Sequence, residues 1–177
     1  MSGHNKWSQI KEKKGATDAK RSKIFGKYSR VIALEAKKAN GNLTASGLRA
    51  IIERARKENM PNDLIDRAVK KGAGGDTGNM EQVLYEAYGP GGCAIVIEGL
   101  TDNKNRTVAE IKHLLSKRGL SLAGQGSAMW AFQKTPDGGL VPQTTVPLSD
   151  EDGASLAALL EELDEHDDVQ EVYTNAE

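Results

Sequence analysis

The sequence predicts an α+β protein, with an amino-terminal three-helix bundle followed by a ferredoxin-like (split βαβ) domain built on an antiparallel sheet. Three observations lead to this prediction. Apolar residues recur at helical spacing up to residue 71, short apolar runs and tight turns dominate afterwards, and the two regions carry opposite charge. They meet in the glycine-rich segment 72–78, which is typical of a flexible linker. We therefore expect two domains, 1–75 and 76–177.

The amino-terminal half is expected to hold three helices. Thr17 or Asp18 can cap the first of them, and Asn62 can cap the third, because their side-chain oxygens accept hydrogen bonds from free backbone N–H groups. Gly72 follows the third helix as its stop signal. The expected ranges of the three helices are 18–40, 45–59 and 63–71.

The second half is expected to combine strands and helices. Thr107 and Glu110 have the spacing of a capping box at the start of a helix. Pro142 and Pro147 weaken one strand, because each removes a backbone donor. From residue 94 onward the order strand, helix, strand, strand, helix, strand is that of the split βαβ arrangement. The expected strands are 83–88, 94–100, 127–134, 140–148 and 169–174, and the expected helices are 105–118 and 150–166.

The net charge of −1 divides into two large and opposite parts. Residues 1–74 contain 18 Lys and Arg against 7 Asp and Glu, whereas residues 75–177 contain 6 against 18. The basic half predicts a polyanionic partner, and the acidic half predicts a solvated surface. The alternative is that the two halves neutralise each other within the fold.

Several classes of function find no support in the sequence. No apolar run approaches the roughly 20 residues of a membrane-spanning helix, and no apolar stretch follows the basic start, so we expect a cytoplasmic protein that does not contact membranes. Cys93 is the single cysteine and lies in an apolar run, which predicts a buried thiol. The three histidines are scattered and no motif joins a nucleophile to a base, so no metal, cofactor, small-molecule substrate or enzymatic activity is expected.

The strongest functional signal is a row of cations along the first helix and in the arm that precedes it. In the helix these residues recur at steps of three, four and seven, on a face separate from the apolar one and with few acidic neighbours. Lys and Arg neutralise phosphates and release counterions, which predicts nucleic-acid binding. A merely solvated helix face is the alternative. The candidate residues are Lys6, Trp7, Lys11, Lys13, Lys14, Lys20, Arg21, Lys23, Lys27, Arg30 and Lys37.

Two interpretations of Trp7 stay open. An indole face can stack on an unpaired base, which contributes about 1–3 kcal/mol. The same side chain can instead anchor the basic arm onto the helical bundle.

A second candidate contact lies where a strand leads into a helix N-terminus. Backbone N–H groups at such a position favour anions, and an arginine there adds a planar fork of donors. A capped loop without a ligand is the alternative. The residues of this loop are Asn103, Lys104, Asn105, Arg106 and Thr107.

Seven stretches carry a resemblance to a known family. They are MSGHNKW at 1–7, DAKRSKIF at 18–25, NMP at 59–61, RAVKKG at 67–72, YEAYGPGG at 85–92, TDNKNRT at 101–107 and DDVQEVY at 167–173. In this order they resemble the signature stretches of the YebC/PmpR family, to which mitochondrial translational activators of cytochrome c oxidase subunit I also belong. The resemblance implies a helical bundle and α/β domains in a cytoplasmic regulator of gene expression. Members are described both as DNA-binding transcriptional regulators and as ribosome-associated translation factors.

The sequence departs from the family in one place. Members usually carry a further α/β domain between the strand ending at 134 and the segment leading to the last helix, where this chain has only residues 135–139. The inserted third domain is therefore expected to be absent, together with any function that it carries.

The leading functional prediction is a non-enzymatic factor that contacts rRNA or tRNA, at the ribosome, through its basic face. A DNA-binding transcriptional regulator that uses the same face is the first alternative. The bundle lacks a helix rich in the Asn, Gln and Arg residues that read base edges, which weakens sequence-specific DNA recognition. A protein-interaction module that works through the acidic half is the second alternative.

Overall fold

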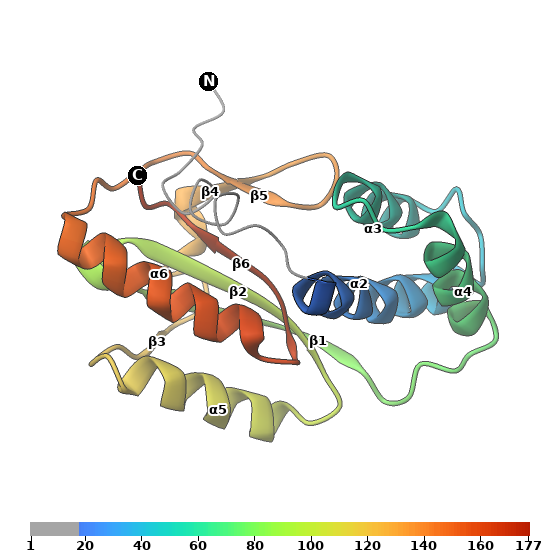
Figure 1. Ribbon diagram of the computed structural model, residues 1–177, viewed down its shortest axis with the longest axis horizontal. Helices are drawn as coiled ribbons and strands as arrows, with labels where there is room; N and C mark the ends of the chain where they lie inside the picture. Colours follow the sequence, from blue (N-terminus) through green and yellow to red (C-terminus); the bar gives the residue numbers. More distant parts are fainter. Residues whose placement is uncertain (1–17) are drawn as a thin grey trace. The chain divides into compact units, whose positions relative to one another are not determined.

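The structure is a computed structural model that describes residues 18–177, and these residues form two compact units (Figure 1). The helical unit contains residues 18–80 together with Thr135–Gly139. The sheet unit contains Glu81–Lys134 and Leu140–Glu177. The predicted fold class is confirmed, because helices come first and an antiparallel sheet with its own helices follows.

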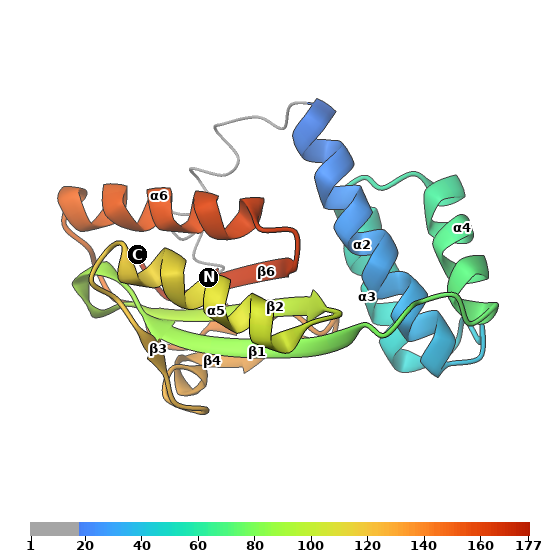
Figure 2. The ribbon, with the colours of Figure 1, turned by 90° about the horizontal axis from the view of Figure 1, so that it is seen from below.

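Three helices make up the helical unit (Figure 2): α2 (Asp18–Lys38), α3 (Ser46–Lys57) and α4 (Asn62–Ala73). Apolar residues at helical spacing pack between them, and Ile32, Leu48 and Ala55 are fully buried. After α2 the chain reverses through Asn40 and Gly41, which both have positive φ, as a glycine-assisted helix end requires. Asn62 is not the cap that the sequence predicts. It is the first residue of α4, and its side-chain oxygen instead accepts a hydrogen bond from Arg56 Nε.

Gly72 does not stop α4, as the sequence predicts, but lies inside it. A Cβ atom at this position would lie 2.0 Å from the backbone oxygen of Ala33 in α2. The glycine is therefore required because the backbones of α2 and α4 approach closely at this point. The sequence pattern of one helix cannot reveal such a contact with another helix.

Within residues 18–177 the sheet has four strands in the order β3-β1-β2-β6, and all neighbouring pairs are antiparallel. Its strands are β1 (Glu81–Tyr88), β2 (Ala94–Thr101), β3 (Leu122–Ala123) and β6 (Val169–Thr174). β1 and β2 form a hairpin through the short 3₁₀ segment Pro90–Gly92, where Gly91 and Gly92 have positive φ. A β-bulge between Glu98 and Gly99 interrupts the pairing of β2 with β6, and a Cβ on Gly99 would lie 2.9 Å from the backbone oxygen of Asp168.

Two helices, α5 (Lys104–Ser116) and α6 (Asp150–Glu165), cover one face of this sheet. Alternate residues of β2, Ile95 and Ile97, point to this face and pack with Leu115 and Leu160 in a fully buried core. Cys93 is buried in the same core, which confirms the predicted buried thiol.

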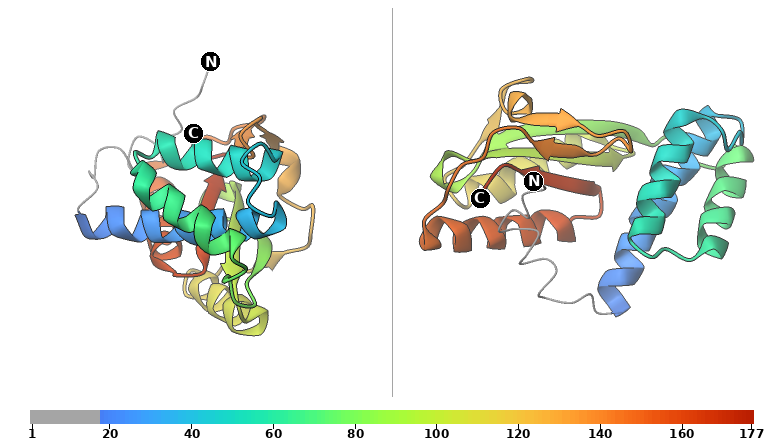
Figure 3. Two further views of the ribbon diagram at one scale, coloured as in Figure 1. Left: turned by 90° about the vertical axis from the view of Figure 1, so that its right-hand side faces the viewer. Right: turned by 90° about the horizontal axis from the view of Figure 1, so that it is seen from above.

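The opposite face is partly covered by a two-stranded sheet, β4 (Phe132–Lys134) and β5 (Leu140–Pro142), and by the 3₁₀ segment η2 (Met129–Ala131) (Figure 3, right). Phe132 and Leu140 bury their side chains against Ala94 and Val96 of β2. These segments differ from the strands predicted at 127–134 and 140–148: both strands are shorter, and they pair with each other outside the main sheet. The split βαβ order predicted from residue 94 onward is therefore not the order of the main sheet, in which β1 and β3 take the places expected for this pair. The two-residue strand β3 takes the edge position beside β1.

Candidate nucleic-acid interface and the Asp168 network

The predicted cations of the first helix do not form a uniformly exposed row. Lys20, Arg21 and Lys37 are exposed, whereas Lys23 and Arg30 are half-buried. Lys27 is only 8% exposed, so we remove it from the predicted contact surface. Of the remaining cations, Lys20, Lys23 and Arg30 each already take part in a polar or electrostatic interaction within the structure. The exposed cations Arg21 and Lys37 are the simplest positions at which to test phosphate contact.

The arm that carries Lys6, Trp7, Lys11, Lys13 and Lys14 lies outside the described residues. The two interpretations of Trp7 and the contact proposed for the arm cations therefore stay predictions.

The helical unit also exposes cations that the sequence interpretation missed. They lie on α3 and α4, and three of them have partners within residues 18–177: Arg56 bonds to Asn62, Lys57 to Asp137 and Arg67 to Asp63. Such exposed contacts contribute about 0–1 kcal/mol and can be exchanged for a phosphate. The helical periodicity of one element could not reveal these cations, but the charge count of residues 1–74 already includes them. The exposed cations of α3 and α4 are Arg49, Arg56, Lys57, Arg67, Lys70 and Lys71.

The second predicted contact loop is the N-terminus of α5. Asn103 is its N-cap, and its side-chain oxygen accepts a hydrogen bond from Arg106 N at 3.1 Å. The predicted capping box of Thr107 and Glu110 is therefore wrong, since both residues lie within the helix. Asn103 N in turn donates to Thr101 Oγ1 at 2.9 Å, which fixes the path from β2 into the helix.

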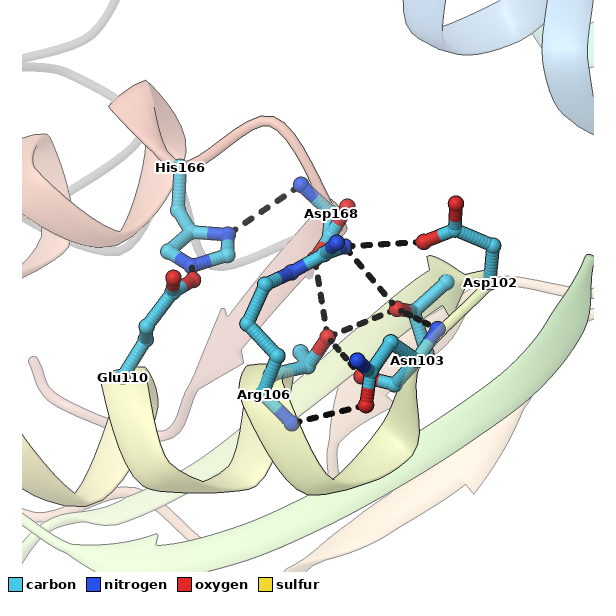
Figure 4. A network of polar contacts seen from close by, with 8 residues as sticks. Asp102, Asn103, Arg106, Glu110, His166 and Asp168 are labelled. Carbon is cyan, nitrogen blue, oxygen red and sulfur yellow. Dashed lines mark hydrogen bonds and ion pairs between the residues drawn. The ribbon is translucent and has the colours of Figure 1, made fainter.

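Asp168, just before β6, gathers the polar side chains of this region into one network (Figure 4). Arg106 Nη2 donates to Asp168 Oδ2 at 2.9 Å and to Asp102 Oδ1 at 3.0 Å. Thr107 Oγ1 lies 2.8 Å from the same Asp168 oxygen and 2.7 Å from Thr101 Oγ1. Burial raises the pKa of the Asp168 carboxyl, but hydrogen bonds from Arg106 and Thr107 outweigh burial and hold that pKa below its usual value. The network thus carries an ionised, buried carboxylate.

His166 and Glu110 extend the network along α5 (Figure 4). His166 Nε2 lies 2.6 Å from Glu110 Oε2, and His166 Nδ1 accepts a hydrogen bond from Asp168 N at 3.1 Å. Glu110, His166 and Asp168 place possible metal-ligand atoms within 4.8 Å of one another. Both ring nitrogens and one carboxylate oxygen are already bonded to protein groups, and a metal ion would have to compete with the Arg106 guanidinium.

This arrangement limits what the second loop can contact. Thr107 is 1% exposed and faces the network, so we remove it from the predicted contact residues. Lys104 forms an exposed ion pair with Glu81 at 3.2 Å, and Asn105 is exposed at the first turn of the helix. Lys104, Asn105 and the exposed part of Arg106 are the groups that remain available to an anion.

Comparison with protein-family models finds two matches that together span nearly all of the chain. Residues 5–75 match the model described as the TACO1/YebC protein N-terminal domain. Residues 80–136 and 137–176 match the model described as the TACO1/YebC second and third domain. The second match is divided at the turn between β4 and β5.

The chain is also similar to bacterial proteins named probable transcriptional regulatory protein. It is 48% identical over 174 residues to one from Fervidobacterium nodosum, an alignment that covers 96% of this chain and 68% of the relative. It is 55% identical over 137 residues to one from Syntrophus aciditrophicus, covering 76% of this chain and 55% of the relative. An alignment of 237 positions with the relative from Desulfosudis oleivorans, at 38% identity, covers 99% of this chain and 96% of that protein.

One similar solved structure is that of a conserved hypothetical protein from Aquifex aeolicus. The TM-score is 0.74 at 29% sequence identity, and the match covers 90% of this chain and 91% of that one. None of the helices within residues 18–177 is long and apolar enough to cross a membrane.

Proposed function

Because the chain belongs to the TACO1/YebC family, we propose that it is a non-enzymatic regulator of gene expression that binds nucleic acid through its helical unit. The concentration of cations in the amino-terminal half is the observation that carries this proposal. Residues 1–74 hold 18 Lys and Arg against 7 Asp and Glu, and most of the described cations are at least partly exposed. A surface of this charge gains affinity for a phosphate backbone through counterion release.

RNA at the ribosome is the ligand that we favour. The α2 and α3 sequences contain no Asn or Gln, although these residues pair with adenine in the DNA major groove. Because α2 and α3 lack these residues, a contact that follows the backbone of rRNA or tRNA fits their surface better than sequence-specific readout. A DNA-binding transcriptional regulator is the second candidate, and the names of the relatives favour it.

We also infer that the relatives' additional residues are inserted at the turn 135–139. The alignment of 237 positions exceeds the 177 residues of this chain, and the family match divides at residues 136 and 137. In this chain a five-residue turn joins β4 to β5 directly. Activities that depend on the inserted residues are therefore not proposed for it.

The salt dependence of binding tests the electrostatic part of the proposal. For about six phosphates on single-stranded RNA, the slope of log affinity against log salt is expected near −4, from about −0.7 per phosphate. Replacing Arg21 and Lys37 by Ala should reduce the magnitude of that slope by up to about 1.4. The matched control replaces Lys112 and Lys134, two exposed lysines of the sheet unit, and should leave the slope unchanged. A slope near zero for the unmodified chain would contradict the proposed electrostatic binding of nucleic acid.

Crosslinking in cells, followed by sequencing of bound RNA and DNA, separates the two ligands. Enrichment of rRNA or tRNA supports the translation factor, whereas enrichment of promoter fragments supports the transcriptional regulator.

A further inference from the structure

Trp130 is held at the surface of the sheet unit by hydrogen bonds. This residue is 58% exposed, although its neighbours Ala128, Ala131 and Phe132 are buried in the core beneath the β4–β5 pair. The indole Nε1 donates to Tyr88 Oη at 3.0 Å, and the Tyr88 hydroxyl donates to the backbone oxygen of Ser127. Tyr88 is itself 36% exposed. An exposed indole fixed at its edge in this way leaves a face of the ring open to a partner.

The loop that carries Trp130 is fixed by a buried charge. Glu86 of β1 is 4% exposed, and its carboxylate accepts backbone N–H groups from Gly126 at 2.5 Å, Ala128 at 3.0 Å and Met129 at 2.6 Å. Burial raises the pKa of the Glu86 carboxyl, but the three N–H donors outweigh burial and lower it below its usual value. The carboxylate is therefore ionised at neutral pH. A buried carboxylate carries a desolvation cost, and here it serves to order the residues directly before an exposed tryptophan.

The charge of the sheet unit indicates which kind of ligand can bind to the exposed indole face. Residues 81–134 and 140–177 of this unit contain 16 Asp and Glu against 6 Lys and Arg, so their field attracts cations and repels phosphates. The face of a tryptophan ring attracts a cation, and the planar arginine guanidinium stacks on it better than a lysine ammonium does. A nucleobase could also stack on the ring, but it would bring phosphates towards an acidic unit.

We propose that Trp130 and Tyr88 form a docking surface for a basic polypeptide segment of a partner protein, which places an arginine side chain on the Trp130 indole. This surface lies in the sheet unit and does not depend on the nucleic-acid contact proposed for the helical unit. It gives the chain a second binding function and a chemically defined class of partner.

The preference for arginine over lysine at equal charge is the sharpest test. The full-length chain is titrated with fluorescently labelled pentaarginine and pentalysine peptides, and binding is followed by anisotropy. Pentaarginine should bind about two- to fivefold more tightly than pentalysine, and Trp130→Ala should remove that difference. Tyr88→Phe, which leaves the indole N–H without its partner, should reduce the difference. The control Val141→Ala removes another exposed apolar side chain of the same unit and should preserve it.

A second readout locates the contact. In a Trp7→Phe chain Trp130 is the only tryptophan, so its fluorescence should change as pentaarginine saturates the protein. An arginine preference that survives Trp130→Ala would overturn the proposal, because the acidic surface alone would then explain binding. A fluorescence response to a single-stranded oligonucleotide in place of the peptide would also overturn it. RNA binding by the Trp130→Ala variant separates the two functions. If the variant loses the arginine preference but keeps its affinity for RNA, the substitution has affected the Trp130 surface alone.

Discussion

Asp168 joins segments that are far apart in the sequence. Its carboxylate accepts hydrogen bonds from the side chains of Arg106 and Thr107 at the start of α5. Its backbone N–H donates to His166 Nδ1, and its backbone oxygen accepts a hydrogen bond from Leu100 N of β2 at 2.8 Å. The sequence of residues 101–107 predicts a capped loop with cations, and the structure contains one. It could not predict Asp168 as the partner of Arg106, because the two residues lie 62 positions apart and neither helical nor strand periodicity connects them.

The Thr107 hydroxyl is expected to contribute measurably to stability. Thr107→Val keeps the shape of the side chain but removes the group that bonds to Asp168 and Thr101, both of which are buried. Asp168 keeps its bond to Arg106 and Thr101 keeps its bond to Asn103 N, but each loses one hydrogen bond inside a buried network. Losing these bonds, one of them to a charged group, costs about 1–3 kcal/mol, so the free energy of unfolding in urea should fall by about that amount. Asn105→Ala, at an exposed position two residues earlier, should change it by less than about 0.5 kcal/mol. Equal effects of the two substitutions would contradict a buried network.

Acid should destabilise the sheet unit through Glu86 and Asp168. The folded pKa of each carboxyl is lowered, so the unfolded chain takes up a proton at higher pH than the folded chain does. The stabilising contribution is complete above the unfolded pKa values of about 4 and is lost as the pH falls through the lower folded values. Free energies of unfolding measured between about pH 6 and pH 2 should therefore decrease, and Glu86→Gln should make the decrease shallower. An unchanged pH dependence in that variant would show that Glu86 does not contribute.

Helices and long strands are the elements that the sequence predicts well, because they carry a periodic apolar face. α2 spans Asp18–Lys38 where the sequence predicts 18–40, and β6 spans Val169–Thr174 as predicted. The region around 122–134 is predicted poorly. β3 has two residues, which are too few to show an alternating pattern. The first residues of the strand expected at 127–134 instead form a loop, whose backbone N–H groups donate to the Glu86 carboxylate. That carboxylate lies about forty residues away along the chain, so local pattern could not indicate it.

Two helix-interior glycines should respond to alanine in opposite directions. Gly72→Ala places a Cβ 2.0 Å from the Ala33 backbone oxygen, so α2 and α4 must separate. Overpacking of this kind costs about 1–3 kcal/mol, which exceeds the gain in helix propensity. Gly26 of α2 is exposed, and a Cβ at this position would meet no neighbouring atom of residues 18–177 within 4 Å, so Gly26→Ala should stabilise the helix by about 0.5–1 kcal/mol.

Urea unfolding of both glycine variants, followed by circular dichroism in the far ultraviolet, measures the difference. Stabilisation by both substitutions would mean that α2 and α4 do not pack as closely as the structure has them. Destabilisation by Gly26→Ala would indicate that its Cβ does meet another part of the chain.

The division of charge is the property of the complete chain that composition alone reveals. This division can be counted from the sequence without knowledge of any contact: 18 of the 24 Lys and Arg residues fall before residue 75. The exposure of single cations is not predictable in the same way. Lys27 has the spacing of the basic row but is buried, since helical position alone does not say which neighbours cover a face. The charge of a half is therefore a firmer basis for the proposed function than any one residue within it.

The two halves are expected to fold separately when divided at the glycine-rich segment 72–78. Each has a buried cluster of its own, around Ile32 and Leu48 in the helical unit and around Ile97 and Leu160 in the sheet unit. Residues 1–74 expressed alone should be helical and should bind RNA with the salt dependence of the full chain. At this length a single core supplies only about 3–5 kcal/mol, so a low melting temperature is expected. Residues 79–177 should unfold cooperatively and should not bind RNA, because their charge repels phosphates. If neither fragment unfolds cooperatively, the two cores depend on each other and the boundary is misplaced. If residues 79–177 retain the RNA affinity of the full chain, the proposed interface is on the wrong half of the chain.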